Sequence, residues 1–258
     1  ARLAATAKAE GSKEDNGLSH PLTTPHDTGA DVLVVITSDT GLCGSYNANL
    51  IAMAEVYLRR DGWQKTPLVF IGKRAHRYFA KRGFTVLDAY LDLAGRPNPA
   101  KTDVIGRTLM QRFLADEVRS VSVLYSKFLS ATTYKPTVQS WLPIQLEGLV
   151  GASPTLPHAA PAVQRRGRFI PAPDEYILEP SAEAVFQDLL PRWTMAKFQL
   201  ILLEAFTSEH SARMVAMKNA TDNAEELLGE LTLLRNKIRQ AAITKELSEI
   251  VGTVEALK

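Results

Sequence analysis

The stretch that decides the fold runs from residue 32 to residue 57 and reads VLVVITSDTGLCGSYNANLIAMAEVY. It begins with Val32–Ile36, a β-branched and leucine run that is typical of a strand buried on both faces, as in a parallel sheet. Glycines and small polar residues follow, which favours a turn. Apolar residues then recur at the spacing of one helix face, at Tyr46, Leu50, Ala54 and Tyr57. The stretch therefore predicts a strand, a turn and a helix.

The same alternation continues downstream and predicts a small α/β domain. A second buried strand at Leu68–Ile71 would complete a parallel, right-handed strand–helix–strand unit. Further strands are expected at Thr85–Leu87 and Val121–Tyr125, with helices at 73–82 and around residues 105–113. Thr137–Leu142 follows a short turn and is expected to be an antiparallel edge strand. A proline-rich stretch near 148–168 predicts a flexible loop within a globular domain of residues 30–180.

The last part of the chain, residues 181–258, predicts a very long helix. Pro191 is its only proline, and its glycines are Gly229 and Gly252. A continuous helix of this length would measure about 110 Å and would project from the small domain. Two apolar seams follow the coiled-coil spacing: Leu227, Leu231, Leu234, Ile238 and Ala241, and then Ile243, Leu247, Ile250, Val254 and Leu257. Such a seam needs a partner helix, and we expect residues 1–15 to be the remnant of an N-terminal helix that is largely absent.

Net charge, the length of apolar runs and the cysteine count argue against several kinds of function and site. Thirty Lys and Arg residues against 28 Asp and Glu leave a formal net charge of +2, so no overall charge favours nucleic acid. The longest apolar runs, Val32–Ile36 and Leu200–Leu203, are far shorter than the roughly 18 to 20 residues that span a bilayer, so no membrane span is expected. Cys43 is the only cysteine, which excludes an internal disulfide and a cysteine-based zinc site.

The turn around Cys43 leaves an enzyme open as an alternative. A thiol just before a helix N-terminus can act as a nucleophile, although the sequence selects no histidine to activate it. The other interpretation is a small buried thiol that packs the turn. Gly41 and Gly44 match neither common phosphate-loop pattern, so nucleotide binding at this turn rests on fold analogy alone.

Basic residues on the helix at 73–82 also have two interpretations. Lys73, Arg77 and Lys81 fall four residues apart, and Arg74 and Arg82 extend the basic face. This is the pattern of a solvated helix face. Contact with phosphate groups or lipid is the alternative.

Two separated signatures carry a resemblance to a known family. SDTGLCGSYNANL occupies Ser38–Leu50, while SEHSARMVAMKNATDNA and RNKIRQAAITKELSEIVG occupy Ser208–Ala224 and Arg235–Gly252. In this order, around an α/β domain, they closely resemble the gamma subunits of F-type ATP synthases, and the similarity extends from His20 over essentially the whole chain.

The resemblance implies a non-catalytic rotor subunit of the central stalk. In that family a Rossmann-like α/β foot docks on the epsilon subunit and the ring of c subunits. A coiled-coil shaft projects from the foot into the catalytic hexamer of alpha and beta subunits, where its rotation couples proton transport to ATP synthesis or hydrolysis. The resemblance therefore implies no cofactor, metal or catalytic residue in this chain. Because the sequence offers no phosphate loop, metal cluster or convincing general-base set, we also expect the chain alone neither to bind nor to hydrolyse ATP.

The resemblance also assigns contact residues and a location. By motif match, the beta subunits are contacted by Arg213, Gln240, Thr244 and Glu246. The c ring is contacted by Tyr176 and Glu179. The expected location is the cytoplasmic face of a bacterial inner membrane, with the matrix side of a mitochondrial membrane as the alternative. Chloroplast members carry a regulatory cysteine pair, and the single Cys43 speaks against that control.

Overall fold

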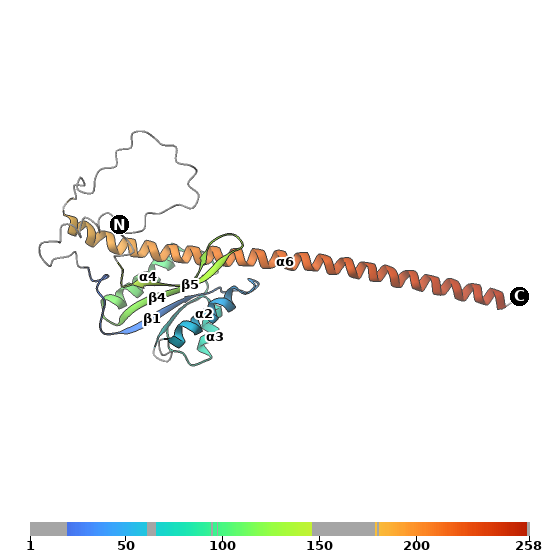
Figure 1. Cartoon of the computed structure of the whole chain (residues 1–258), viewed down its shortest axis with the longest axis horizontal. Helices are drawn as coiled ribbons and strands as arrows, with labels where there is room; N and C mark the ends of the chain where they lie inside the picture. Colours follow the sequence, from blue (N-terminus) through green and yellow to red (C-terminus); the bar gives the residue numbers. More distant parts are fainter. Residues whose placement is uncertain are drawn as a thin grey trace, which may run out of the picture.

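The computed structural model describes residues 20–60, 66–93, 95–96, 98–145, 179 and 181–256. The elements, in chain order, are β1 (Ala30–Ile36), α2 (Tyr46–Arg60), β2 (Leu68–Ile71), α3 (Lys73–Ala80), β3 (Val86–Tyr90), α4 (Pro99–Leu114), β4 (Val118–Phe128), β5 (Tyr134–Leu142) and α6 (Ala182–Ala256). Figure 1 shows an α/β foot from which α6 projects far to one side. The expected fold class, an α/β domain with a long C-terminal helix, is confirmed. Residues 1–15 and 148–168, for which a helix remnant and a loop are predicted, lie outside the described residues.

The foot is built on one five-stranded sheet of order β3-β2-β1-β4-β5. β1 pairs in parallel with β2 and with β4, and β2 pairs in parallel with β3. β5 runs antiparallel to β4, as its short connecting turn predicts. The expected third strand at Thr85–Leu87 is displaced to Val86–Tyr90, because this edge strand is only half buried and lacks a clear apolar run. Because β1, β2, β3 and β4 run parallel, their carboxyl ends lie at one edge of the sheet, and the loop between β1 and α2 begins at that edge.

Alternating side chains of the central strands divide the core into two layers. Val32, Val34 and Ile36 face one side of β1, where α4 and the first part of α6 cover the sheet. Leu33 and Val35 face the other side, which α2 and α3 cover. The sheet thus lies between two helical layers, as Figure 1 shows.

Helix α6 runs without interruption for 75 residues. Ser181 caps it, since its hydroxyl accepts a hydrogen bond from the backbone N–H of Ala184 at 3.1 Å. Pro191 lies inside the helix and donates no bond to the carbonyl of Gln187. The His20 ring lies close to the Gln187 backbone, one turn before this proline.

Candidate functional site: a projecting helix and its seat in the foot

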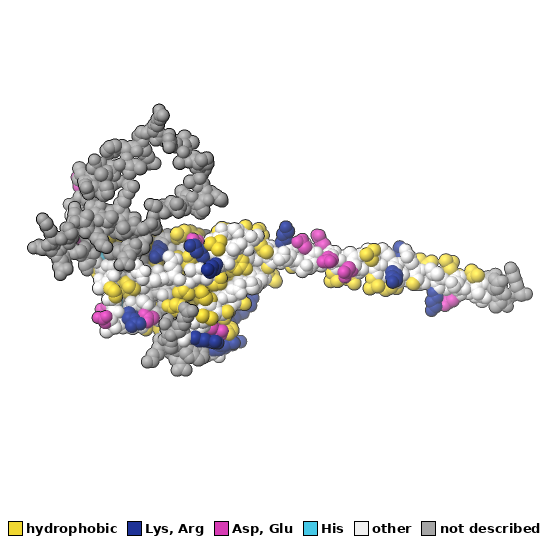
Figure 2. Space-filling view, viewed as in Figure 1, with side chains coloured by type: hydrophobic (Ala, Val, Ile, Leu, Met, Phe, Trp, Pro, Cys, Tyr) yellow, Lys and Arg dark blue, Asp and Glu magenta, His cyan; other side chains and the backbone are white. Residues whose placement is uncertain are grey.

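The outer part of α6 is exposed on all sides. From Met217 to Thr253 every side chain is exposed except Asn236, which is half-buried. Figure 2 shows apolar side chains along this part of the helix, interspersed with acidic and basic ones. The exposed apolar residues include Leu227, Leu228, Leu231, Leu234, Ile238, Ile243, Leu247 and Ile250. In the part of the chain that the structure describes nothing covers this stripe, so it is a surface suited to contact with other chains.

Gln240, Thr244 and Glu246 lie together on this outer part, and all three are exposed. The hydroxyl of Thr244 donates to the Gln240 carbonyl at 2.9 Å, and the hydroxyl of Ser248 donates to the Thr244 carbonyl at 2.9 Å. The Thr244 hydroxyl can still accept a hydrogen bond, while the Gln240 amide and the Glu246 carboxylate face solvent. The structure therefore places Gln240 and Thr244 on one face of α6, whereas Glu246, two residues after Thr244, projects from another face of the same turn.

Arg213 lies elsewhere, where α6 meets the foot. It stands 27 residues before Gln240, which corresponds to about 40 Å along the helix. Its guanidinium donates to the Glu209 carboxylate at 2.7 Å and to the Thr40 hydroxyl at 2.8 Å, and its Nε lies 3.4 Å from the Gly41 carbonyl. Only 3% of the Glu209 side chain is exposed, against 20% for Arg213. The side chain predicted to contact a partner thus also joins α6 to the loop between β1 and α2.

Three other buried donors fix the same part of α6, and sequence reasoning did not find them. The hydroxyl of Tyr46 donates to the Ala205 carbonyl at 3.1 Å, and the hydroxyl of Ser208 donates to the Ser126 carbonyl at 2.8 Å. The indole N–H of Trp141 donates to the Thr194 carbonyl at 3.0 Å. We call these three pairs, together with the contacts of Arg213 to Glu209 and Thr40, the α6 seat.

Electrostatic interactions stabilise the α6 seat. Burial, and next the nearby Glu209 carboxylate, raises the pKa of Tyr46 far above its usual value, so its hydroxyl stays protonated and remains a donor. Breaking one partner of a buried ion pair is costly, because it leaves an uncompensated charge. The only sequence signal for this site is the spacing of Glu209 and Arg213, which is the favourable order for a helical ion pair.

Of the two residues expected at the other end of α6, only Glu179 is described. It is exposed, three residues before the helix begins. Tyr176 lies outside the described residues. Helix α6 begins at Ala182, three residues after Glu179, and continues unbroken past Gln240.

Cys43 is buried, with 2% of its surface exposed. The Asn47 amide donates to its sulfur at 3.0 Å, and the Ser38 hydroxyl lies 3.9 Å away. A buried thiol held in this way packs the turn and is poorly placed to react with solutes. Within the described ranges no three potential metal ligands come together, and no helix there is long and apolar enough to cross a membrane.

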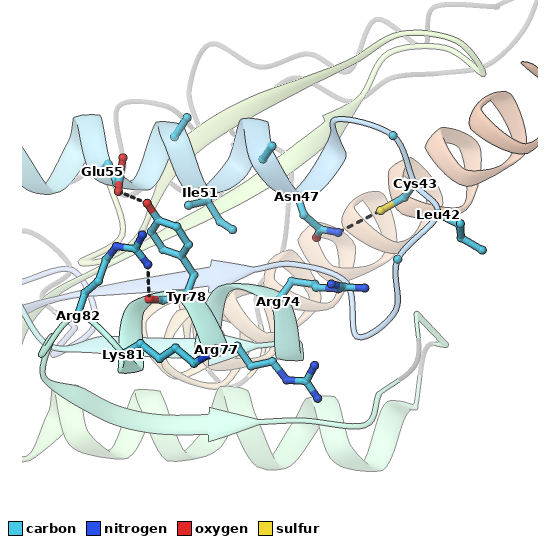
Figure 3. Close-up of a pocket in the computed structure, with 14 residues that line it drawn as sticks. Leu42, Cys43, Asn47, Ile51, Glu55, Arg74, Arg77, Tyr78, Lys81 and Arg82 are labelled. Carbon is cyan, nitrogen blue, oxygen red and sulfur yellow. Dashed lines mark hydrogen bonds between the residues drawn. The ribbon is translucent and has the colours of Figure 1, made fainter. Parts of the chain in front are cut away.

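Beside this turn, a groove of about 860 Å³ lies between α2 and α3. Figure 3 shows Asn47 and Ile51 on α2 and, across from them, Arg74 and Arg77 on α3 and Lys81 directly after α3. The predicted basic helix therefore exists, and its cations border a concave surface. Glu55 is the only carboxylate among the residues that line the groove, and it accepts a hydrogen bond from the Tyr78 hydroxyl at 2.6 Å.

Comparison with known proteins gives a consistent result. A family model described as ATP synthase matches residues 2–257. The ATP synthase gamma chain of Syntrophobacter fumaroxidans is 40% identical over 249 residues, which cover 95% of this chain and 79% of that relative. The ATP synthase gamma chain of Anaeromyxobacter sp. (strain Fw109-5) is 37% identical over 259 residues, which cover 100% of this chain and 81% of that relative.

Solved structures show the same fold at lower identity. A chain of the Euglena gracilis mitochondrial ATP synthase, in a structure of its OSCP, F1 and c-ring parts, superposes with a TM-score of 0.60 and 20% identity, over 99% of this chain and 86% of that chain. A chain from the central stalk and c ring of the Tetrahymena thermophila enzyme gives a TM-score of 0.54 and 20% identity, over 85% of this chain and 96% of that chain.

Proposed function

Because this chain belongs to the family of ATP synthase gamma chains, we propose that it is the central-stalk rotor subunit of an F-type ATP synthase. In this role it performs no bond chemistry itself. It couples rotation of the membrane ring of c subunits to ATP synthesis or hydrolysis on the beta subunits of the hexamer. The burial of Cys43 removes the main support for a small α/β enzyme, and none of the relatives favours that alternative.

The observation that carries this proposal is the division of α6 into a seated part and an exposed part. Its first part packs against β4, β5 and α4 through buried apolar residues and the α6 seat. Its outer part projects along one continuous helix with no break between the two. A torque applied to the foot is therefore passed along backbone hydrogen bonds into the projecting end.

The proposed contacts suit a surface that must engage and release. We assign beta-subunit contacts to Arg213, Gln240, Thr244 and Glu246. Exposed hydrogen bonds contribute only about 0.5 to 1.5 kcal/mol each, or up to about 3 kcal/mol with a charge. Contacts of this size can break and form again as the shaft turns, and each changes the relative stability of the nucleotide-binding states that it touches.

The proposal places the other end of the molecule near a membrane. Glu179 and Tyr176 would meet the c ring, and the epsilon subunit would bind the foot. The bacterial origin of the most similar relatives supports a complex associated with the bacterial inner membrane, with this chain on the cytoplasmic face.

A double variant, Gln240→Ala with Thr244→Ala, tests the proposal in the assembled complex. If α6 acts as a turning shaft, the complex should assemble at normal stoichiometry, while ATP turnover and proton pumping fall by about fivefold or more. Subunit stoichiometry and ATPase rate are measured on the same purified sample.

The matched control is Thr207→Ala with Gln111→Ala, which removes the same two side-chain types from exposed positions on the seated part of α6 and on α4. Thr207 donates to the Leu203 carbonyl at 2.7 Å, as Thr244 does to Gln240, so the control also reproduces the lost hydrogen bond within the helix. A passive scaffold predicts the reverse result for the first variant, namely poor assembly with normal turnover in whatever complex forms, and that result would refute the shaft assignment.

A further inference from the structure

The groove between α2 and α3 is lined by several positively charged side chains. Four of its lining residues are cationic, namely Arg74, Arg77, Lys81 and Arg82. All four side chains are exposed. No described carboxylate lies within ion-pair distance of Arg74, Arg77 or Lys81, whereas Lys73 on the same helix pairs with Asp92. These cations repel one another and gain little electrostatic stabilisation from the rest of the foot.

The two walls of the groove differ in chemistry. The α2 wall presents Ala48, Ile51 and Ala52, which are small or apolar, between the polar Asn47 and Glu55, while α3 and the turn after it present the cations. The Tyr78 ring stiffens the α3 side, since its hydroxyl donates to Glu55 and the Arg82 guanidinium lies 3.5 Å from its ring centre. Figure 3 shows Glu55 directed at Tyr78, with Arg82 beside the same ring.

An exposed leucine stands at the end of the groove. Leu42 is 74% exposed and has a φ of 62°, a left-handed conformation that is unfavourable for a leucine. Its neighbours in the turn hold it there, with Cys43 buried beneath. The side chain therefore adds an apolar contact point beside the small residues of α2.

From these features we propose that the groove binds an acidic amphipathic α-helix of a partner protein. A third helix fits between two neighbouring helices, with an apolar stripe against α2 and Leu42 and a row of carboxylates against α3. A small polyanion would satisfy only the cationic wall, and a flat bilayer would not enter a concave surface. This inference goes beyond the proposed rotor function and does not depend on it.

The test measures binding of a synthetic helical peptide to the full chain. The peptide is as long as α2, with leucines along one face and glutamates beside them, and fluorescence anisotropy follows its binding. Arg74→Gln with Arg77→Gln and Lys81→Gln should weaken binding about tenfold or more, which corresponds to ~1.4 kcal/mol or more. The double variant Ala48→Gln with Ala52→Gln leaves the net charge unchanged, and glutamine is still a good helix former. Its larger side chains fill the space along α2, so this variant should weaken peptide binding by a similar factor.

The control variant neutralises three exposed cations outside the groove, Lys101→Gln with Lys127→Gln and Lys135→Gln, and should bind the peptide like the unaltered chain. Inorganic tripolyphosphate and vesicles that contain phosphatidylglycerol are the competing probes. Equal losses in the control and in the α3 variant would overturn the proposal. It would also be overturned if tripolyphosphate or vesicles bound at the groove while the peptide did not, or if filling the α2 wall left peptide binding unchanged.

Discussion

At the scale of single residues, Gly72 shows how closely the backbone of the foot is packed. It connects β2 to α3 with a φ of 101°, and a Cβ atom there would lie 2.0 Å from the Thr37 carbonyl oxygen. Both the conformation and the contact require glycine. The close approach sets the start of α3, and therefore the position of the cations along the groove.

Gly72→Ala should unfold the chain or destabilise it by about 3 kcal/mol or more, because backbone atoms on both sides must move. Gly83→Ala is the matched control. Its φ of 76° is also left-handed, yet no atom lies within 4 Å of a Cβ there, so the cost should be only about 1 to 2 kcal/mol. Urea unfolding followed by circular dichroism measures both variants, and equal losses would contradict the packing argument.

His20 makes the stability of the foot sensitive to pH. The ring is buried, and Leu22 donates its backbone N–H to Nδ1 at 3.0 Å. Burial lowers the pKa of His20, although the hydrogen bond to the Gln187 backbone partly opposes this shift. The folded chain thus prefers neutral His20. Protonation of Nδ1 would place a proton on the atom that now accepts the hydrogen bond from the Leu22 backbone N–H.

Since the folded pKa lies below the unfolded one, the stability that neutral His20 contributes is complete above about pH 6.5 and is lost as pH falls through the folded pKa. The difference in unfolding free energy between the unaltered chain and His20→Gln should therefore shrink from about pH 7 to about pH 5. Urea titrations at several pH values measure it. A difference that stays constant across this range would show that His20 does not couple to folding.

At the scale of elements, the sequence predicts the helices and strands that a local pattern of residues identifies. The run at Val32–Ile36 and the helical spacing from Tyr46 onward identify β1 and α2, and the scarcity of helix breakers identifies α6. The predicted position of β3 is wrong because the residues of this edge strand show only a weak pattern of burial. The α6 seat is not predictable, because Arg213 meets Thr40 across 173 residues and no local rule connects them. Gln240, Thr244 and Glu246 remain predicted contacts, derived from motif similarity.

The exposed stripe of α6 predicts association when the chain is isolated. Helical stability depends mainly on packing of an apolar face, and from Met217 to Thr253 the described structure offers that face no partner. We expect the purified chain to self-associate through this segment or to show fast amide exchange there. Leu234→Glu with Ile238→Glu should abolish the self-association, as light scattering would show. A monomeric chain with strong protection throughout the segment would contradict this expectation.

At the scale of the whole molecule, the central claim is that foot and shaft turn as one body. The sheet, the two helical layers and the α6 seat hold the first part of α6, and the helix continues unbroken to its outer end. The cysteine of a Thr132→Cys variant, in the exposed turn between β4 and β5, offers a place to attach a bead, because Cys43 is buried.

The most direct measurement observes such a bead on the foot while the hexamer of alpha and beta subunits is fixed to a surface and supplied with ATP. If foot and shaft turn as one body, the bead should rotate continuously in one direction, at a rate that follows ATP hydrolysis. A foot that stays still while the complex hydrolyses ATP at its full rate would show that the chain is not a rotating shaft.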